Sequence, residues 1–215
     1  MNQKEERPIF ITIDGIDGVG KSTQLIRLTE FLQRLGRRVI TVRDPGSSEV
    51  GKRLREILLS SDLEMHRRTE AMLFMASRCE MVETIIKPSL KRGDIVVSDR
   101  FLLANVVYQS IGGEIASDEL WELGLLANGN LKPDLTLLFD MPASEAMRRI
   151  NGPADRMESR GVDYMESVRQ AFLAELPRSS PVCAVIDASR NPDEVTSQML
   201  EHVSSFLDSH IHHVE

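Results

Sequence analysis

Cysteine and long apolar runs are scarce in this chain of 215 residues, and each scarcity excludes a class of protein. The only cysteines are Cys79 and Cys183, and neither has a C-x-x-C or zinc-ligand spacing, so we expect no disulfide framework and no structural metal. No apolar run approaches the ~18 residues that cross a bilayer. Residues 1–8 are polar and charged, without the apolar stretch of a secretory signal. The sequence therefore predicts a cytoplasmic protein.

An excess of basic residues is also lacking, since the formal net charge is −7. A protein that coats nucleic acid or lies on a membrane surface needs a basic face for phosphates, so we expect neither partner. A nucleotide substrate is still compatible, because a few arginines and lysines make a locally positive cleft in an acidic protein. His210, His212 and His213 near the chain end are interpreted as a solvated tail rather than a metal site.

The pattern that is present is an alternation of short apolar runs with longer helical stretches, which predicts an α/β fold. We expect a three-layer arrangement in which a five-stranded parallel sheet is flanked by helices, with residues 1–215 forming one domain that carries a small lid. The third and fourth runs are apolar on both faces, as buried parallel strands are. The expected strands span residues 9–14, 38–43, 94–98, 134–139 and 182–187.

The helical patterns are amphipathic and end at glycine or polar residues. One long pattern, 67–90, is expected to be interrupted near Pro88. The polar, glycine-flanked segment from Gly152 to Gly161 predicts a mobile loop between helices, and the lid is placed at about 150–161. The other expected helices span residues 21–35, 48–59, 103–109, 117–127 and 192–207.

A phosphate-binding pattern, G-x-x-x-x-G-K-[ST], follows the first expected strand and opens the first expected helix. Its glycines allow a tight turn whose N–H groups point at phosphate oxygens, and the helix adds the positive end of its dipole. Lys21 is expected to bridge the β- and γ-phosphates, and Ser22 to offer its hydroxyl to Mg²⁺. The segment consists of Gly15, Ile16, Asp17, Gly18, Val19, Gly20, Lys21, Ser22 and Thr23.

This pattern is shared by GTPases, ATPase motors and small-molecule kinases. The guanine-reading tetrapeptide N-K-x-D of GTPases does not occur in the sequence. A motor usually needs a longer chain for its partner surfaces. The remaining motifs therefore decide the class.

Several separated motifs follow in a fixed order. Arg43-Asp44-Pro45-Gly46 ends the second expected strand, and it is either a simple turn or part of an acceptor pocket. Phe74 and Arg78 lie four residues apart on one helical face. Asp99-Arg100-Phe101 ends the third strand, where ligands gather in parallel sheets. Asn105, Tyr108 and Gln109 come next.

From residue 9 to about 206 this order resembles the thymidylate kinase family, of the bacterial type with lid arginines. The resemblance implies phosphoryl transfer from ATP to dTMP, giving dTDP and ADP, with Mg²⁺ as cofactor. It also implies a homodimer. Two departures occur: Asp44 replaces the usual glutamate, and Ala104 stands where the family usually has serine.

The resemblance implies a role for each acceptor-side residue. Phe74 would stack on the thymine ring, and Arg78 would donate to its exocyclic oxygen. Arg100 would grip the acceptor phosphate bidentately. Asn105 would contact the base edge and Tyr108 would pack against the deoxyribose, with Gln109 beside them. The alternatives left open are a core Phe74 beside a surface Arg78, and a purely structural Asp99–Arg100 pair.

Two carboxylates are candidates for the metal. Asp99 would hold Mg²⁺ or its waters, or orient Arg100. Asp17 matches a family residue near the acceptor sugar and the metal, although a loop carboxylate is equally compatible with simple solvation. Together with Ser22 they form the expected metal site.

The lid would supply the catalytic arginine, because this phosphate loop contains none. Arg156 lies in a D-R-x-E stretch and is the candidate, with Arg160 as the second possibility. Asn151 and Pro153 stand where relatives have arginine. Arg149 would lie against the adenine ring by a cation–π contact.

Two rival functions stay open. One is a kinase for another deoxynucleoside monophosphate or for a nucleoside, although a nucleoside acceptor would need a carboxylate base and the Arg100 clamp favours a phosphorylated one. The other is a nucleotide-binding module without turnover. Met72, Met75 and Met81 are interpreted as core, with a dimer interface as the alternative.

Overall fold

The computed structural model describes residues 7–60, 63–150 and 161–211. Its centre is a five-stranded sheet in the order β2-β3-β1-β4-β5, in which every pair is parallel. The middle strand β1 (Ile9–Asp14) is buried along its whole length between β3 (Ile95–Asp99) and β4 (Leu135–Asp140). The edge strands are β2 (Val39–Arg43) and β5 (Val182–Asp187). The predicted parallel sheet is confirmed, and so is the burial of its third and fourth strands.

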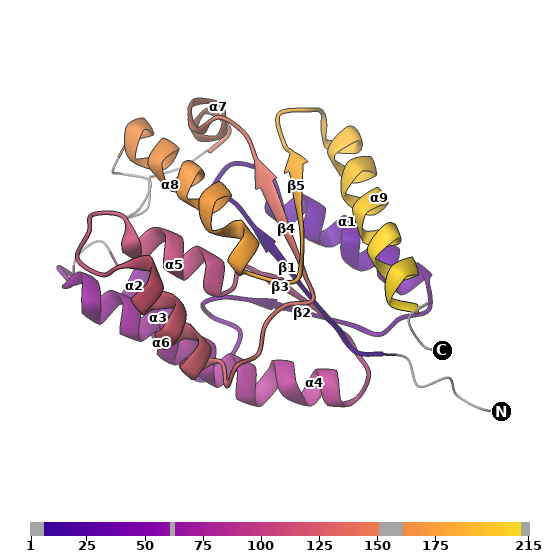
Figure 1. Cartoon of the computed structure of the whole chain (residues 1–215), viewed down its shortest axis with the longest axis horizontal. Coiled ribbons are helices and arrows are strands. Elements are labelled where there is room, and N and C mark those ends of the chain that lie inside the picture. The colour runs from indigo at the N-terminus through magenta and orange to yellow at the C-terminus, as the bar shows by residue number, and fades with distance from the viewer. Residues whose placement is uncertain (1–6, 61–62, 151–160, 212–215) are drawn as a thin grey trace.

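The strand register brings the functional segments to one edge of the sheet. Ile13 pairs with Asp99, and Arg43 pairs with the same Asp99 from the other side. The carboxyl ends of β1, β2 and β3 therefore lie next to one another. The arrowheads of β4 and β5 in Figure 1 point to the edge where α7 (Ala143–Arg148) lies.

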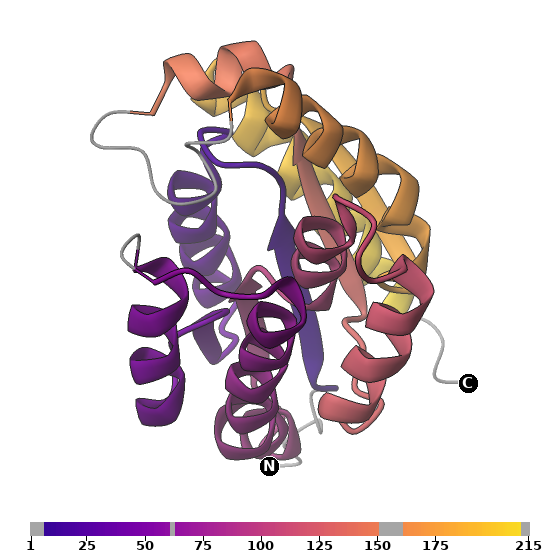
Figure 2. The same cartoon turned by 90° about the vertical axis from the view of Figure 1, so that its left-hand side faces the viewer.

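Helices cover both faces of the sheet and complete the three layers. α1 (Lys21–Arg34) and α9 (Pro192–Ile211) pack against each other on one face. α5 (Leu102–Ser110), α6 (Ser117–Ala127) and α8 (Val162–Glu175) lie on the other face (Figures 1 and 2). α2 (Glu49–Leu59) packs on α3 (Arg67–Met81), which in turn contacts α5 and α6.

The interruption expected near Pro88 is a π-helical turn, Val82–Ile86, between α3 and α4 (Lys87–Lys91). Proline has no N–H and its ring collides with the carbonyl four residues earlier, so a regular α-helix cannot pass it. A wider turn before the proline removes that conflict while the chain stays helical. Pro88 then lies in the first turn of α4, where proline is tolerated.

Some predicted boundaries were wrong. α9 continues to Ile211 rather than ending at residue 207, so its backbone includes His210, which was expected in the solvated tail. α8 had no predicted bounds. Met75 and Met81 are buried core residues as predicted, but Met72 is 54% exposed, so its assignment to the core was wrong.

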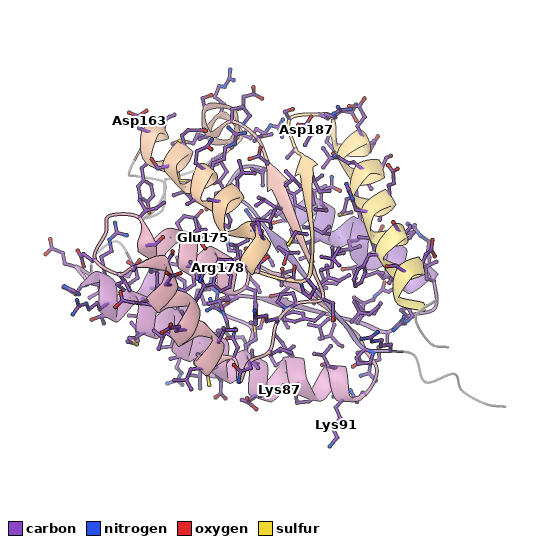
Figure 3. The ribbon with its side chains drawn as sticks, in the orientation of Figure 1. Lys87, Lys91, Asp163, Glu175, Arg178 and Asp187 are labelled. Carbon is purple, nitrogen blue, oxygen red and sulfur yellow. The ribbon has the colours of Figure 1, made fainter. Side chains whose placement is uncertain are left out.

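Labelled residues mark the two ends of the molecule in Figure 3. Asp187, at the end of β5, and Asp163, in the first turn of α8, lie at the edge where the strands end. Lys87 and Lys91 on α4 lie at the opposite end. Glu175 and Arg178 form an ion pair between them, at 3.2 Å. Within the described residues no helix has the length and apolar character that a membrane span requires.

Candidate functional site

The turn between β1 and α1 depends on its glycines. Gly15, Gly18 and Gly20 have φ values of 138°, 85° and 89°, a region that side-chain-bearing residues rarely adopt. A Cβ atom on Gly18 would lie 2.1 Å from the Ala146 carbonyl oxygen, whereas one on Gly20 would meet nothing within 4 Å. α1 then begins without a side-chain cap and without an acidic residue in its first turn. Its first N–H groups are therefore suited to an anion, as the motif predicts.

Lys21 is folded back onto this turn. Its Nζ donates to the carbonyl oxygens of Gly15 and Ile16 at 3.0 and 2.7 Å and lies 3.6 Å from Asp17 Oδ1. Burial and the neighbouring Arg100 charge lower the pKa of Lys21 to about 8, although the surrounding carboxylates oppose the shift. The ammonium is thus anchored beside the turn.

Asp17 joins the phosphate loop to the end of β3. Its Oδ1 accepts a hydrogen bond from Arg100 Nη2 at 2.7 Å. Burial alone would raise the pKa of Asp17, but the charges and hydrogen bonds of Arg100 and Lys21 outweigh it and hold that pKa well below its usual value. Asp17 is therefore an ion-pair partner, and simple solvation does not describe it.

Arg100 is held in a strained position, and its side chain is largely buried, at 17% exposed. Its φ is 68°, which is uncommon for a residue other than glycine and costs on the order of 1 kcal/mol. Its guanidinium lies over the Tyr108 ring at 5.2 Å, and its Nη1 is shielded from solvent without a hydrogen-bond partner in the described part of the chain. Although burial opposes it, the charge of Asp17 raises the pKa of Arg100. Nη1 can therefore donate a hydrogen bond to an anion bound beside it.

A pocket of about 640 Å³, counted to its open mouth, lies beside this ion pair. That volume suits a ligand of nucleotide size. The pocket brings together all the residues predicted on the acceptor side. Its lining residues are Asp17, Arg43, Asp44, Pro45, Arg55, Leu59, Phe74, Arg78, Arg100, Phe101, Ala104, Asn105, Tyr108 and Gln109.

Arg78 is among the most buried side chains of the protein, 1% exposed, so the surface-arginine alternative was wrong. Its Nε donates to Asp44 Oδ2 at 2.5 Å and its Nη1 to Asn105 Oδ1 at 3.0 Å. The Arg43–Gly46 segment is thus both a turn and part of the pocket wall. Half-buried Phe74 lines the same pocket one helical turn before Arg78.

Asp99 does not form the structural pair with Arg100 that was considered. Its Oδ2 lies 3.6 Å from Arg43 Nε, while its Oδ1 is buried and accepts no hydrogen bond from the described residues. Ser22 lies exposed in the first turn of α1, together with Thr23. The part of the chain that is described contains no group of three or more histidine, cysteine or acidic side chains placed to hold a metal ion by themselves.

Asp14 is a buried carboxyl group near Arg100 and Lys21 that the motif analysis did not single out. It ends β1 directly before the phosphate loop, it is fully buried, and neither of its oxygens has a hydrogen-bond partner within the described ranges. Burial raises its pKa to about 7, although Arg100 and Lys21 oppose the shift. A carboxylate at the end of an apolar strand, next to the first glycine, was the signal for it.

Arg149 follows α7, as expected, and donates to the carbonyl oxygens of Ala188 and Ser189 at 3.0 and 3.3 Å, beyond the end of β5. It therefore stands at the same edge of the sheet as the phosphate loop. Arg156, Arg160, Asn151 and Pro153 lie outside the described residues, as does nearly all of the predicted lid.

Comparison with known proteins identifies one family. The family model described as "Thymidylate kinase" matches residues 13–199. A protein named thymidylate kinase from Rhodopirellula baltica is 63% identical over 186 residues, which cover 86% of this chain and 76% of that protein. Thymidylate kinases from Bifidobacterium longum subsp. infantis and Thermosipho melanesiensis are 36% and 37% identical, and the matches cover 96% and 93% of this chain and 91% and 100% of theirs.

Proposed function

The chain belongs to the thymidylate kinase family and transfers a phosphoryl group to dTMP, giving dTDP, and we propose that ATP donates this group across the Asp17–Arg100 ion pair. One observation carries the proposal. Arg100 Nη2 donates to Asp17 of the phosphate loop. Arg100 Nη1 lies beside the pocket, shielded from solvent and without a hydrogen-bond partner among the described residues. An anion gripped there would lie next to one bound by the loop.

The donor side is the loop from Gly15 to Thr23. Backbone N–H groups and the start of α1 would hold the triphosphate, and Lys21 would move from the Gly15 and Ile16 carbonyls to the β- and γ-phosphates. Arg149, at the same edge of the sheet, would lie against adenine.

The acceptor side is the pocket. Phe74 would stack on the thymine ring and Arg78 would donate to its exocyclic oxygen. Asn105 and Gln109 line the pocket wall and would face the base edge, and Tyr108 would pack on the deoxyribose. Arg100 would hold the phosphate through Nη1, because a guanidinium matches the geometry of a phosphate.

The residues near the loop fit Mg²⁺. Ser22, Asp17 and Asp99 offer oxygen ligands, which this ion prefers, and Asp99 Oδ1 is buried and without a partner among described residues. Among the residues that the structure describes, no three or more histidine, cysteine or acidic side chains gather to hold the ion, so substrate phosphates would supply further oxygen ligands. When bound, Mg²⁺ would neutralise developing charge on the transferred group.

The reaction needs positioning more than a strong base. A nucleoside monophosphate has a second pKa of about 6, so near neutral pH it is largely a dianion and a competent nucleophile. Lys21 and Arg100 would neutralise charge on the transferred group from two sides. We assign the remaining positive charge to Arg156 of the lid, with Arg160 as the second candidate.

We further propose that residues 1–215 form one kinase domain that acts as a homodimer. Apolar side chains are exposed on three helices that contact one another in series, α2, α3 and α6. Val50 and Ile57 on α2 are 48% and 40% exposed, Met72 on α3 is 54% exposed and Leu126 on α6 is 78% exposed. Exposed apolar groups of this kind favour burial against a second copy.

The test is a coupled assay of ADP release with dTMP, dUMP, dCMP, dGMP and thymidine as separate acceptors. We expect the highest kcat/KM with dTMP and no turnover of thymidine, which lacks the phosphate that Arg100 would hold. Faster turnover of another nucleotide would favour the other-nucleotide kinase. ATP binding without any turnover would favour the non-catalytic module.

A further inference from the structure

A chain of buried hydrogen bonds runs from four lining residues of the pocket to Glu70, which does not line it. Arg78 donates to Asp44 and to Asn105 Oδ1, Asn105 Nδ2 donates to Gln109 Oε1 at 2.5 Å, and Gln109 Nε2 donates to Glu70 Oε1 at 2.8 Å. All five residues are 3% exposed or less. Glu70 lies on α3, two turns before Arg78, so the chain leaves that helix, crosses α5 and returns to it.

The two ends of this chain set its direction. A carboxylate oxygen only accepts and a guanidinium only donates, whereas an amide can turn over and exchange its donor for its acceptor. Glu70 requires the Gln109 nitrogen, so the Gln109 oxygen faces Asn105. Arg78 requires the Asn105 oxygen, so the Asn105 nitrogen faces Gln109. Both ends demand the same orientation, and turning either amide would place like groups together at a cost of about 1–3 kcal/mol.

We propose that Glu70 is a positioning residue that makes the pocket select thymine over cytosine by fixing the orientation of the Gln109 and Asn105 amides. This rests on the proposed function, in which Arg78 and Asn105 meet the base. Glu70 does not line the pocket, and it would act on the base only through Gln109 and Asn105.

The selected orientation matches one pyrimidine edge. Thymine offers an acceptor at its exocyclic oxygen and a donor at N3–H, whereas cytosine offers an amino donor and an unprotonated acceptor nitrogen. Arg78 Nη2 makes no hydrogen bond within the described residues and can donate, and the second lone pair of Asn105 Oδ1 can accept. This donor–acceptor pair is complementary to thymine. A reversed Asn105 would present its nitrogen and fit cytosine better at N3.

Glu70→Gln tests the proposal because an amide at position 70 can either accept from the Gln109 nitrogen or donate to the Gln109 oxygen. Position 70 then no longer favours one orientation of Gln109. We expect the ratio of kcat/KM for dTMP to that for dCMP to fall by about tenfold. The ratio of dTMP to dUMP should stay within about twofold of wild type, because thymine and uracil share the same hydrogen-bonding edge. A role in stability alone would lower all three kcat/KM values together.

Two further variants sharpen the test. Glu70→Gln combined with Gln109→Glu puts the carboxylate at position 109, where it accepts from Asn105 and from the new amide, so the double variant should recover the wild-type dTMP to dCMP ratio. Glu80→Gln makes the same chemical change in a half-buried residue of the same helix and should leave the ratio unchanged.

An unchanged dTMP to dCMP ratio in Glu70→Gln would overturn the proposal. If that variant does not fold, the double variant decides alone, and a ratio below wild type in a folded double variant would overturn the proposal. Absence of dTMP turnover in the wild-type chain would instead refute the proposed function, and this inference with it.

Discussion

The donor loop and the acceptor pocket of this site are built in opposite ways. The loop is a run of adjacent residues, Gly15 to Thr23, and most of what it offers is backbone. The pocket is an assembly of side chains from α2, α3, α5 and the ends of β2 and β3. They are joined by contacts such as Arg78 to Asp44 and Arg100 to Asp17, which lie 34 and 83 residues apart in sequence. Changes in the loop therefore act through conformation, whereas changes in the pocket remove single chemical groups.

The two cations of the site show the same contrast. Lys21 and Arg100 share a cluster of carboxylates, and Lys21 is buried while Arg100 is largely buried, yet the pKa of Lys21 falls to about 8 while that of Arg100 rises. A compact ammonium loses more on leaving water than a delocalised guanidinium, which also gains the close pair with Asp17. The charge of Lys21 on the donor side therefore changes near pH 8, whereas the charge of Arg100 on the acceptor side does not change there.

Removing the guanidinium of Arg100, which would hold the dTMP phosphate, should have the largest effect on activity. Arg100→Ala is expected to lower kcat/KM for dTMP by about 10³-fold, because a preorganised charged donor to the phosphate is lost. Calorimetric titration with ATP should give a Kd within about threefold of wild type, since the loop backbone is untouched. Loss of less than about tenfold in kcat/KM would show that the pocket does not depend on this arginine.

Two glycine substitutions in the donor loop distinguish the cost of a steric clash from the cost of an unfavourable φ angle. Gly18→Ala forces a Cβ to within 2.1 Å of the Ala146 carbonyl oxygen and should lower the free energy of unfolding by more than about 3 kcal/mol. Gly20→Ala meets nothing within 4 Å, so only the φ of 89° opposes it, at about 1 kcal/mol. Denaturant melts compare them directly, and equal losses would contradict the picture of a loop packed on α7.

Asp14 lies between the two halves, and its effect should appear in the pH dependence of stability. Its pKa is raised from 3.8 to about 7, so the folded state retains a proton that the unfolded state loses, and stability falls as pH rises from about 4 to about 7. Asp14→Asn removes that penalty, which is on the order of a few kcal/mol above pH 7. The melting temperature of this variant minus that of wild type should therefore be higher at pH 8 than at pH 5. A difference that does not change with pH would refute the raised pKa.

The smallest expected effect concerns Lys21. In the free enzyme its ammonium loses its proton near pH 8, so kcat/KM for ATP should fall above that pH by up to about tenfold per unit. kcat/KM for dTMP at saturating ATP should stay level over the same range, because Arg100 remains charged and bound triphosphate holds the Lys21 proton. Parallel pH profiles for both substrates would contradict the contrast between the two halves.

The sequence predicted the donor loop and the sheet well, because both depend on local features. Three glycines at fixed spacing and a lysine at a helix start specify a conformation within a few residues, and apolar runs specify buried strands. Helix ends were less accurate: α9 runs four residues past its predicted end, and its terminal residues follow no local stop signal.

The pocket could be predicted only by resemblance. Nothing local in the sequence says that Arg78 is buried on Asp44, that Asp17 pairs with Arg100 rather than with solvent, or that Asp99 turns to Arg43. Each of these follows from packing between segments that are far apart in the chain. Glu70 went unassigned for the same reason, whereas Asp14 had a local signal, its place at the end of an apolar strand, that the motif pattern does not include.

The central claim is that the two halves converge at the Asp17–Arg100 pair, so that donor and acceptor phosphates meet. It is tested most directly by calorimetric binding of a single molecule in which adenosine and thymidine are joined through a chain of phosphates. The compound should bind more than about 100-fold more tightly than dTMP and be displaced by both ATP and dTMP. Displacement by only one of them, or affinity no greater than that of dTMP, would show that the two sites do not meet.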